Sequence, residues 1–174
     1  MRRIKLGEFE IVSNKATISD PCYEPGIWCA AVLDNVLNGT WTAVVATCED
    51  DRIDRLIAFH GKSERVAPWD IVPIMIGVDS GQAGIFDAAH YQDDEVAMTV
   101  EKIGPEIICP EEPWYSMCCD RTLNTEHSAD VVPFGCVSSS GYGDGSYHCY
   151  VKKDGQGYIV GIMVEFISEV ATQN

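Results

Sequence analysis

Short stretches of alternating apolar and polar residues, separated by turn dipeptides, run through most of this 174-residue chain. Such alternation puts one face of an extended strand against a core and the other toward solvent, so it predicts β structure. Apolar residues make up 46% and charged residues 22%, which excludes wholesale disorder. We therefore predict a single domain over residues 1–174, mostly β, built as an antiparallel sandwich or open barrel with one or two short helices.

The strands expected in the first half of the chain are short and closely spaced. They cover residues 4–12, 15–18, 28–33, 40–47 and 52–60, and turn signals such as Asn38-Gly39 separate them. Pro68 and Pro73 bracket an irregular passage, which leads into a strand over 74–78 and a glycine-rich turn over 79–84. One short helix is expected near Asp87, and another near Pro113, because proline favours the first turn of a helix.

The C-terminal part gives the clearest pattern. Three consecutive antiparallel strands are expected over residues 131–140, 146–152 and 158–167. The last of these has one charged residue, Glu165, which is typical of a central strand buried on both faces.

The aromatic residues divide into two groups. Trp28 and Trp41 lie inside strand patterns and are expected in the core. Trp114 and Tyr115 follow acidic residues and a proline, so we expect them to be exposed and able to contact a ligand or partner.

The cysteines and the N-terminal residues indicate the compartment. The chain has eight cysteines, and no two of them have Cys-x-x-Cys spacing. The basic N-terminus is not followed by the apolar segment of a secretory signal. We expect a cytoplasmic protein with reduced thiols, most of them buried as small apolar side chains. The longest apolar run, residues 71–78, is too short to cross a membrane, so no membrane partner is expected.

The net charge limits the partners. The chain has 27 acidic and 12 basic residues, a net charge of −15, which argues against a partner held through the phosphate backbone of duplex nucleic acid. The acidic runs at residues 49–51, 93–95 and 111–112 are typical of solvated surface. The same charge would suit an acidic protein-binding module or a polyanion mimic. Assembly into a homo-oligomer is compatible with the sequence.

Two blocks of sequence are similar to a known family. Residues 77–87 read Gly-Val-Asp-Ser-Gly-Gln-Ala-Gly-Ile-Phe-Asp, and residues 140–147 read Ser-Gly-Tyr-Gly-Asp-Gly-Ser-Tyr. They resemble the bacterial and phage family known as domain of unknown function 4241, in which both turns recur. Asp20 and the proline after it match an early Asp-Pro of that family, whereas Glu165 stands where an aspartate is usual. The resemblance extends over about residues 15–168 and implies a shared fold and pocket, but no known activity.

The glycine-rich turns supply the candidate binding site. Glycine lets a backbone approach a ligand while a neighbouring carboxylate points at it, so we predict that Asp20 and the turn aspartates converge. Amides of the 141–145 turn can form a small anion nest, and exposed aromatic rings can stack on a base. The candidate ligand-binding residues are Asp79, Ser80, Gln82, Asp87, Gly143, Asp144, Ser146, Tyr147, Trp114 and Tyr115.

Catalysis is not favoured, and no catalytic residue, metal ligand or cofactor is predicted. Ser146 and His148 share one face of a strand, an arrangement poorly placed for a proton relay, and no His pair has metal-ligand spacing. We hypothesise a non-catalytic protein that binds a small, nucleotide-derived signal, as a phage-type accessory or counter-defence protein. The alternatives are a metal-dependent phosphoesterase that uses the turn aspartates, and the acidic binding module.

Overall fold

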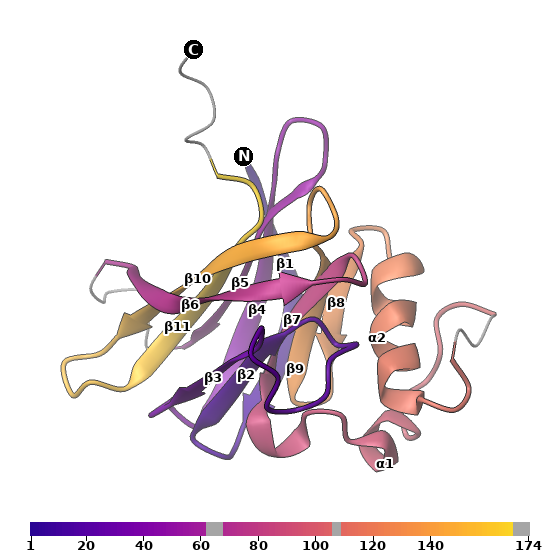
Figure 1. Ribbon diagram of the computed structural model, residues 1–174, viewed down its shortest axis with the longest axis horizontal. Helices are drawn as coiled ribbons and strands as arrows, with labels where there is room; N and C mark the ends of the chain where they lie inside the picture. Colours follow the sequence, from indigo (N-terminus) through magenta and orange to yellow (C-terminus); the bar gives the residue numbers. More distant parts are fainter. Residues whose placement is uncertain (62–67, 106–108, 169–174) are drawn as a thin grey trace.

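The computed structural model describes residues 1–61, 68–105 and 109–168, which form two antiparallel sheets packed face to face (Figure 1). The strands are β1 (Arg2–Ile11), β2 (Lys15–Ser19), β3 (Ala31–Asp34), β4 (Gly39–Thr47), β5 (Ile53–His60), β6 (Asp70–Val78), β7 (Gln82–Asp87), β8 (Ala129–Val132), β9 (Gly135–Ser139), β10 (Gly145–Lys153) and β11 (Ile159–Glu165). The six-stranded sheet has the order β1-β4-β5-β11-β10-β6, and the five-stranded sheet has the order β3-β2-β7-β9-β8. The predicted mostly-β sandwich is confirmed, and neither sheet of the described part closes into a barrel.

The main core lies between the two sheets. Inward-facing residues of the alternating strands fill it, including Phe9 and Ile11 of β1 and Trp41 of β4. The indole N–H of Trp41 donates to the carbonyl of Leu37 at 2.9 Å. Trp41 is fully buried, as predicted. Strand β11 lies between β5 and β10 and is buried along nearly its whole length, so the predicted central strand is confirmed.

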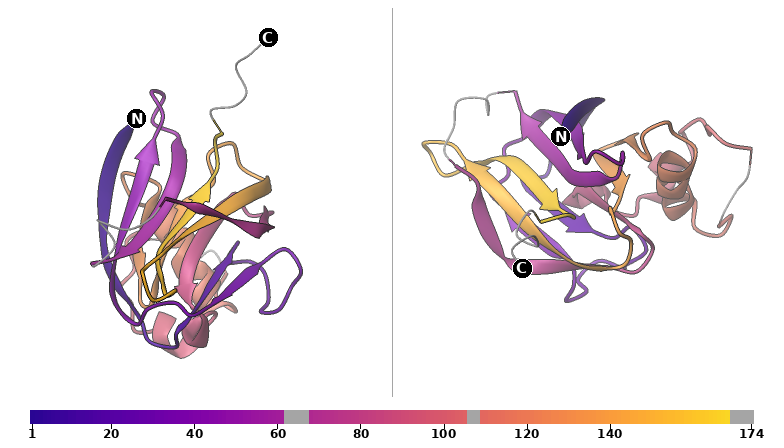
Figure 2. Two further views of the ribbon diagram at one scale, coloured as in Figure 1. Left: turned by 90° about the vertical axis from the view of Figure 1, so that its left-hand side faces the viewer. Right: turned by 90° about the horizontal axis from the view of Figure 1, so that it is seen from above.

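A second apolar layer covers the outer face of the five-stranded sheet. Helix α2 (Pro113–Leu123) packs there, and the short helix α1 (Asp94–Ala97) lies beside it, so both stand to one side of the sandwich (Figure 2). Trp114 is only 3% exposed, with its ring 4.9 Å from the rings of both Phe86 and Tyr91. The prediction of an exposed Trp114 was therefore wrong, because the helix turns this face toward the sheet.

Several strand boundaries differ from the prediction. The passage around Pro73 is not irregular: β6 begins at Asp70, and it tolerates the proline because it is an edge strand. Strand β3 begins only at Ala31, and Trp28 lies before it with 89% of its surface exposed, so its predicted place in the core was wrong. The predicted glycine-rich turn ends earlier than expected, because the buried strand β7 begins at Gln82.

The C-terminal region contains one more strand than predicted. Residues 131–140 do not form a single strand, because the chain reverses at Pro133 and Phe134 to make the pair β8 and β9. Phe134 takes the left-handed backbone conformation, with φ of 61°, that this tight reversal requires. Strands β10 and β11 pair as expected, whereas β9 belongs to the other sheet.

The helices and cysteines follow the expectations more closely. A 3-10 turn (Ala88–His90) follows Asp87, and Pro113 is the first residue of the 11-residue helix α2, where a short helix was predicted. No described helix has the length and apolar character needed to span a bilayer. All eight cysteines are free thiols, and five are buried, as predicted for most of them.

Candidate functional site

Asp20 organises the meeting point of the glycine-rich turns. Its carboxylate is fully buried just after β2, and one oxygen, Oδ2, accepts the backbone N–H groups of Asp79 and Ser80 at 2.8 and 2.7 Å. The other oxygen accepts the Ser80 hydroxyl at 2.6 Å and the N–H of Cys22 at 2.9 Å. Three of these four hydrogen bonds hold the 79–81 turn in one conformation, and the fourth fixes the chain just after Asp20.

The two family-like blocks touch each other at this turn. The carboxylate of Asp144 accepts the N–H of Gly81 at 3.0 Å, and the N–H of Ser140 donates to the Gly81 carbonyl at 3.0 Å. Asp79 accepts the phenol of Tyr23 at 2.5 Å, and this hydrogen bond raises the pKa of Tyr23. The segments that carry Asp20, Asp79 and Asp144 therefore meet through these hydrogen bonds, whereas a binding pocket shared by the three carboxylates stays a prediction. We call Asp20, Asp79, Ser80, Gly81 and Asp144 the Gly-Asp junction.

The junction has already used the groups that would bind an anion. Three successive backbone N–H groups, those of residues 79, 80 and 81, donate to the protein's own carboxylates. In the second block, the Gly143 N–H donates to Ser140, and the Tyr147 hydroxyl lies 2.6 Å from the Gly143 carbonyl oxygen. These contacts make the junction a structural support, and its acidic rim disfavours a phosphate.

Asp87 does not join the junction, because it lies at the opposite end of β7. One oxygen accepts the backbone N–H groups of Val12 and Ser13 at 2.9 Å and the Ser13 hydroxyl at 2.7 Å. The second oxygen is buried and has no hydrogen-bond partner in the described residues. Asp79, Asp87 and Asp144 therefore do not converge, and the described part of the chain contains no group of three metal-ligating side chains.

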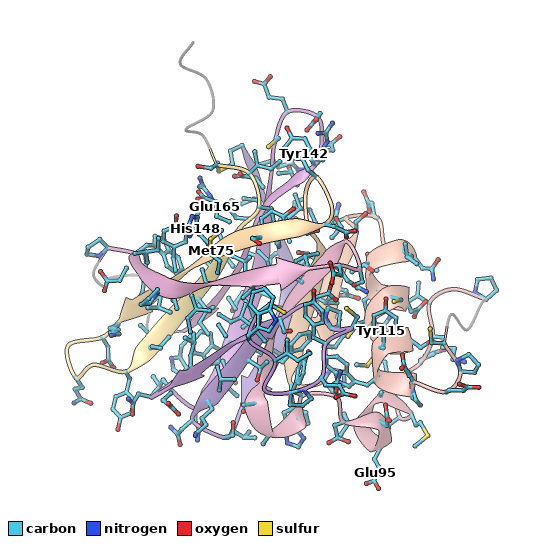
Figure 3. The ribbon with its side chains drawn as sticks, viewed as in Figure 1. Met75, Glu95, Tyr115, Tyr142, His148 and Glu165 are labelled. Atoms are coloured by element: carbon cyan, nitrogen blue, oxygen red, sulfur yellow. The ribbon has the colours of Figure 1, made fainter. Side chains whose placement is uncertain are left out.

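The remaining predicted residues lie on different surfaces. Ser146 and His148 are exposed on the outer face of the six-stranded sheet, and Tyr147 points into the core, so the predicted alternation is confirmed. His148 lies across from Met75 on one neighbouring strand and from Glu165 on the other (Figure 3). The backbone of Ser146 pairs with Gly77, two residues before Asp79, but its side chain is exposed on the outer face of the sheet.

Gln82 and Tyr115 connect the junction to helix α2. The Gln82 side chain donates to the Cys119 thiol at 3.2 Å and accepts the Thr122 hydroxyl at 3.1 Å, so its polar groups are used inside the protein. Tyr115, the third residue of α2 (Figure 3), is half-buried rather than exposed as predicted, and burial raises the pKa of its phenol to about 12. The phenol is therefore neutral at physiological pH.

A polar cavity of about 310 Å³ at one end of the sandwich was not predicted. Its walls come from the start of β1, the β4–β5 turn, the segment before β8 and the end of β9. They carry three basic side chains, three acidic side chains and a buried hydroxyl. These are Arg2, Arg52, His127, Asp50, Asp51, Glu126 and Thr47, and we call this space the end cavity.

Thr47 is the most informative residue of the end cavity. It is 4% exposed, and its hydroxyl has no hydrogen-bond partner among the described residues. The pairing register of β4 with β5 shifts between Ala46 and Thr47, and such irregularities often redirect a side chain beside a functional site. A buried hydroxyl without a partner is costly, so an external partner would stabilise it.

Arg52 links the end cavity to the second glycine-rich block. Its guanidinium group pairs with Asp50 at 2.9 Å and lies 4.6 Å from the ring centroid of Tyr142. The Tyr142 ring is 71% exposed at the same end of the molecule (Figure 3). The acidic run at 49–51 is exposed, as the sequence predicts for solvated surface, but Asp50 and Asp51 also line the cavity, and Tyr142 is absent from the predicted ligand-binding residues. The unusual Tyr between two glycines was the one sequence signal for this site.

The fold and the end cavity define a small β-sandwich protein with a candidate site for a polar small molecule. The chain belongs to the family described as protein of unknown function (DUF4241), whose model matches residues 75–164. This match contains Asp79, Ser80, Gly81 and Asp144, and ends short of the span over which the resemblance was expected. No curated protein and no solved structure matches the chain.

Proposed function

We propose that this chain is a non-catalytic binding protein that holds a small, nucleotide-derived ligand in the end cavity. The observation that carries the proposal is the buried, unpartnered Thr47 hydroxyl in a cavity lined by Arg2, Arg52 and His127. In a chain with a net charge of −15, the guanidinium groups of Arg2 and Arg52 and the imidazole of His127 supply donors for an anionic group, while the three carboxylates of the same wall can accept only from donor groups of a ligand.

The chemistry of the walls matches the parts of a nucleotide. Guanidinium groups bind phosphates through paired hydrogen bonds, and Arg2 and Arg52 can supply them. The carboxylates of Asp51 and Glu126 can accept ribose hydroxyls. The exposed Tyr142 ring can stack on a base, a contact that contributes about 1–3 kcal/mol.

The Gly-Asp junction supports this site indirectly. Asp20 fixes the 79–81 turn, Asp144 ties that turn to the 140–145 turn, and the latter carries Tyr142. The junction carboxylates are held by the protein's own donors, and Asp87 lies apart. The arrangement favours ligand capture over a metal-dependent phosphoesterase that uses these aspartates.

The direct test is calorimetric titration of the purified chain with ADP-ribose and with a set of cyclic mono- and dinucleotides. We expect one of them to bind, and Thr47→Val to weaken its binding about tenfold, since one hydrogen bond contributes about 1–1.5 kcal/mol. The same substitution should stabilise the ligand-free protein, because it removes an unpartnered buried hydroxyl. A purely structural role for Thr47 cannot produce both effects.

Two further variants test whether the Tyr142 ring contributes to nucleotide binding. Tyr142→Ala should weaken binding about tenfold or more, whereas Tyr158→Ala, at an exposed tyrosine in the β10–β11 turn, should leave it unchanged. Absence of binding by every nucleotide tested would overturn the proposal. A nucleotide product that forms with Mg²⁺ or Mn²⁺, and is abolished by a chelator, would support the phosphoesterase instead.

A cellular role follows from capture. A protein that binds a nucleotide signal without consuming it lowers the free concentration of that signal, so we propose a cytoplasmic, phage-type counter-defence role. Expression of the chain should suppress a nucleotide-signalled defence response, and Thr47→Val should restore it. A response that persists in the presence of the wild-type chain would contradict this role.

A further inference from the structure

A second, chemically different cavity lies between helices α1 and α2. It has a volume of about 290 Å³, and most of its wall is apolar. The apolar wall residues are Ala97, Met98, Val100, Pro110, Pro113 and Met117. Both helices stand to one side of the sandwich (Figure 1), so this cavity is separate from the end cavity.

Two carboxylates hold the walls of this cavity in place. Asp94 of α1 accepts the backbone N–H of Trp114 at 2.9 Å and so joins the two helices. Asp120 of α2 accepts the N–H groups of Ile103 and Gly104, each at 2.8 Å. Burial opposes the charge of Asp120, yet these amides lower its pKa. The walls are therefore fixed by charged hydrogen bonds, and the cavity is formed before any ligand arrives.

The exposed side chains around this cavity indicate the chemistry of its ligand. Met98 is 68% exposed and Ile103 is 47% exposed, which is unusual for large apolar residues so close together. Methionine side chains adapt to irregular apolar ligands. Lys102 provides a cation for an acidic head group, whereas Glu101 beside it and the Asp120 carboxylate, which is already bonded to two backbone N–H groups, disfavour a head group with more than one negative charge.

We infer that this cavity binds a small aliphatic carboxylate, with the hydrocarbon chain between Met98 and Met117 and the single carboxylate at Lys102. The cavity volume is close to the lower limit of ordinary ligand sites, so the ligand is a medium-length chain. This inference does not depend on nucleotide binding at the end cavity.

The test uses octanoate as the probe and the five methionine methyl groups as reporters. In a ¹³C-methyl-methionine NMR titration, the signals of Met98 and Met117 should shift in a saturable way, with a dissociation constant of about 1 mM or lower. The signals of Met1, Met75 and Met163 should not move. Equal shifts at all five methyl groups, or none at Met98 and Met117, would overturn the inference.

Charge reversal tests the head group. Lys102→Glu should weaken octanoate binding at least fivefold, whereas Lys153→Glu, at an exposed lysine of β10 in the sandwich, should leave it unchanged. Neither position lies in the core, so both variants should fold. Octanol that binds as tightly as octanoate, together with an unaffected Lys102→Glu variant, would also overturn the inference.

Discussion

Replacing Asp20 by asparagine should destabilise the protein far more than an ordinary surface substitution. The asparagine oxygen can still accept the N–H groups of Asp79 and Ser80, and its NH₂ group can donate to the Ser80 hydroxyl. The N–H of Cys22 then faces a donor and loses its hydrogen bond. The two bonds from the N–H groups of Asp79 and Ser80 keep a neutral acceptor, and the bond to the Ser80 hydroxyl reverses its direction, so all three lose the negative charge of the carboxylate.

These losses set the expected magnitude. A hydrogen bond to a charged group contributes about 1.5–3 kcal/mol, and a neutral one about half as much. One lost bond, at about 1.5–3 kcal/mol, and three weakened ones, at about 0.8–1.5 kcal/mol each, give a destabilisation of about 4–7 kcal/mol. This is a large part of the roughly 5–15 kcal/mol that stabilises a typical domain.

Urea unfolding of the wild type, Asp20→Asn and Asp34→Asn measures this difference. Asp34 is a matched control, because its carboxylate pairs with Lys15 at 3.0 Å on the surface, where such pairs contribute about 0–1 kcal/mol. If Asp20→Asn lowers the free energy of unfolding by less than about 1 kcal/mol, or by no more than Asp34→Asn does, the supporting role assigned to Asp20 is refuted.

Two other substitutions, one of them with a matched control, and one chemical modification test separate parts of the structure. Gly84→Ala should destabilise the protein by about 1–3 kcal/mol or more in the same urea assay, because a Cβ at this position would overlap the ring of Phe86. Trp114→Ala should cost about 3–5 kcal/mol, whereas Trp28→Ala, at an exposed side chain, should change stability by less than about 0.5 kcal/mol; equal effects would contradict the assigned positions. Desolvation of the Cys22 thiol beside Asp20, followed by its hydrogen bond to that carboxylate, raises the pKa of this exposed cysteine to about 12, so the thiolate fraction is low at neutral pH. Alkylation of Cys22, followed by mass spectrometry, should therefore accelerate about tenfold per pH unit between about pH 8 and 11, and a plateau near pH 9 would contradict the raised pKa.

The regular strands could be predicted because their pattern depends only on which face is buried. Strand β11, with its run of apolar residues up to Glu165, is an example. Strand β7 was placed in a turn because it begins beside glycines. Gly84 and Gly135 both lie within strands. These two strand positions are glycine because the ring of Phe86 occupies the space where a side chain would be. That packing reason is visible only in three dimensions.

The Gly-Asp junction was predicted in part. The turns marked the aspartates as a group, and three of them do meet. The partners could not be predicted, since the bonds from Asp20 to the 79–81 turn span about 60 residues. Trp114 was misplaced for a related reason: nothing local to Pro113 and its acidic neighbours shows that α2 lies against a sheet.

The end cavity could not be predicted from any one segment. Arg2, Thr47, Arg52 and His127 come from three separate parts of the chain. Each has an ordinary sequence context, and their common feature is the shared space that the fold creates. A hydroxyl without a partner becomes apparent only when every nearby donor and acceptor has been placed.

A crystal structure of the chain with the tightest-binding nucleotide from the calorimetric set would test the central claim most directly. The account predicts electron density in the end cavity, with a phosphate between Arg2 and Arg52 and a hydrogen bond to the Thr47 hydroxyl. Nucleotide density at the Gly-Asp junction or between α1 and α2, with Thr47 still unpartnered, would contradict it.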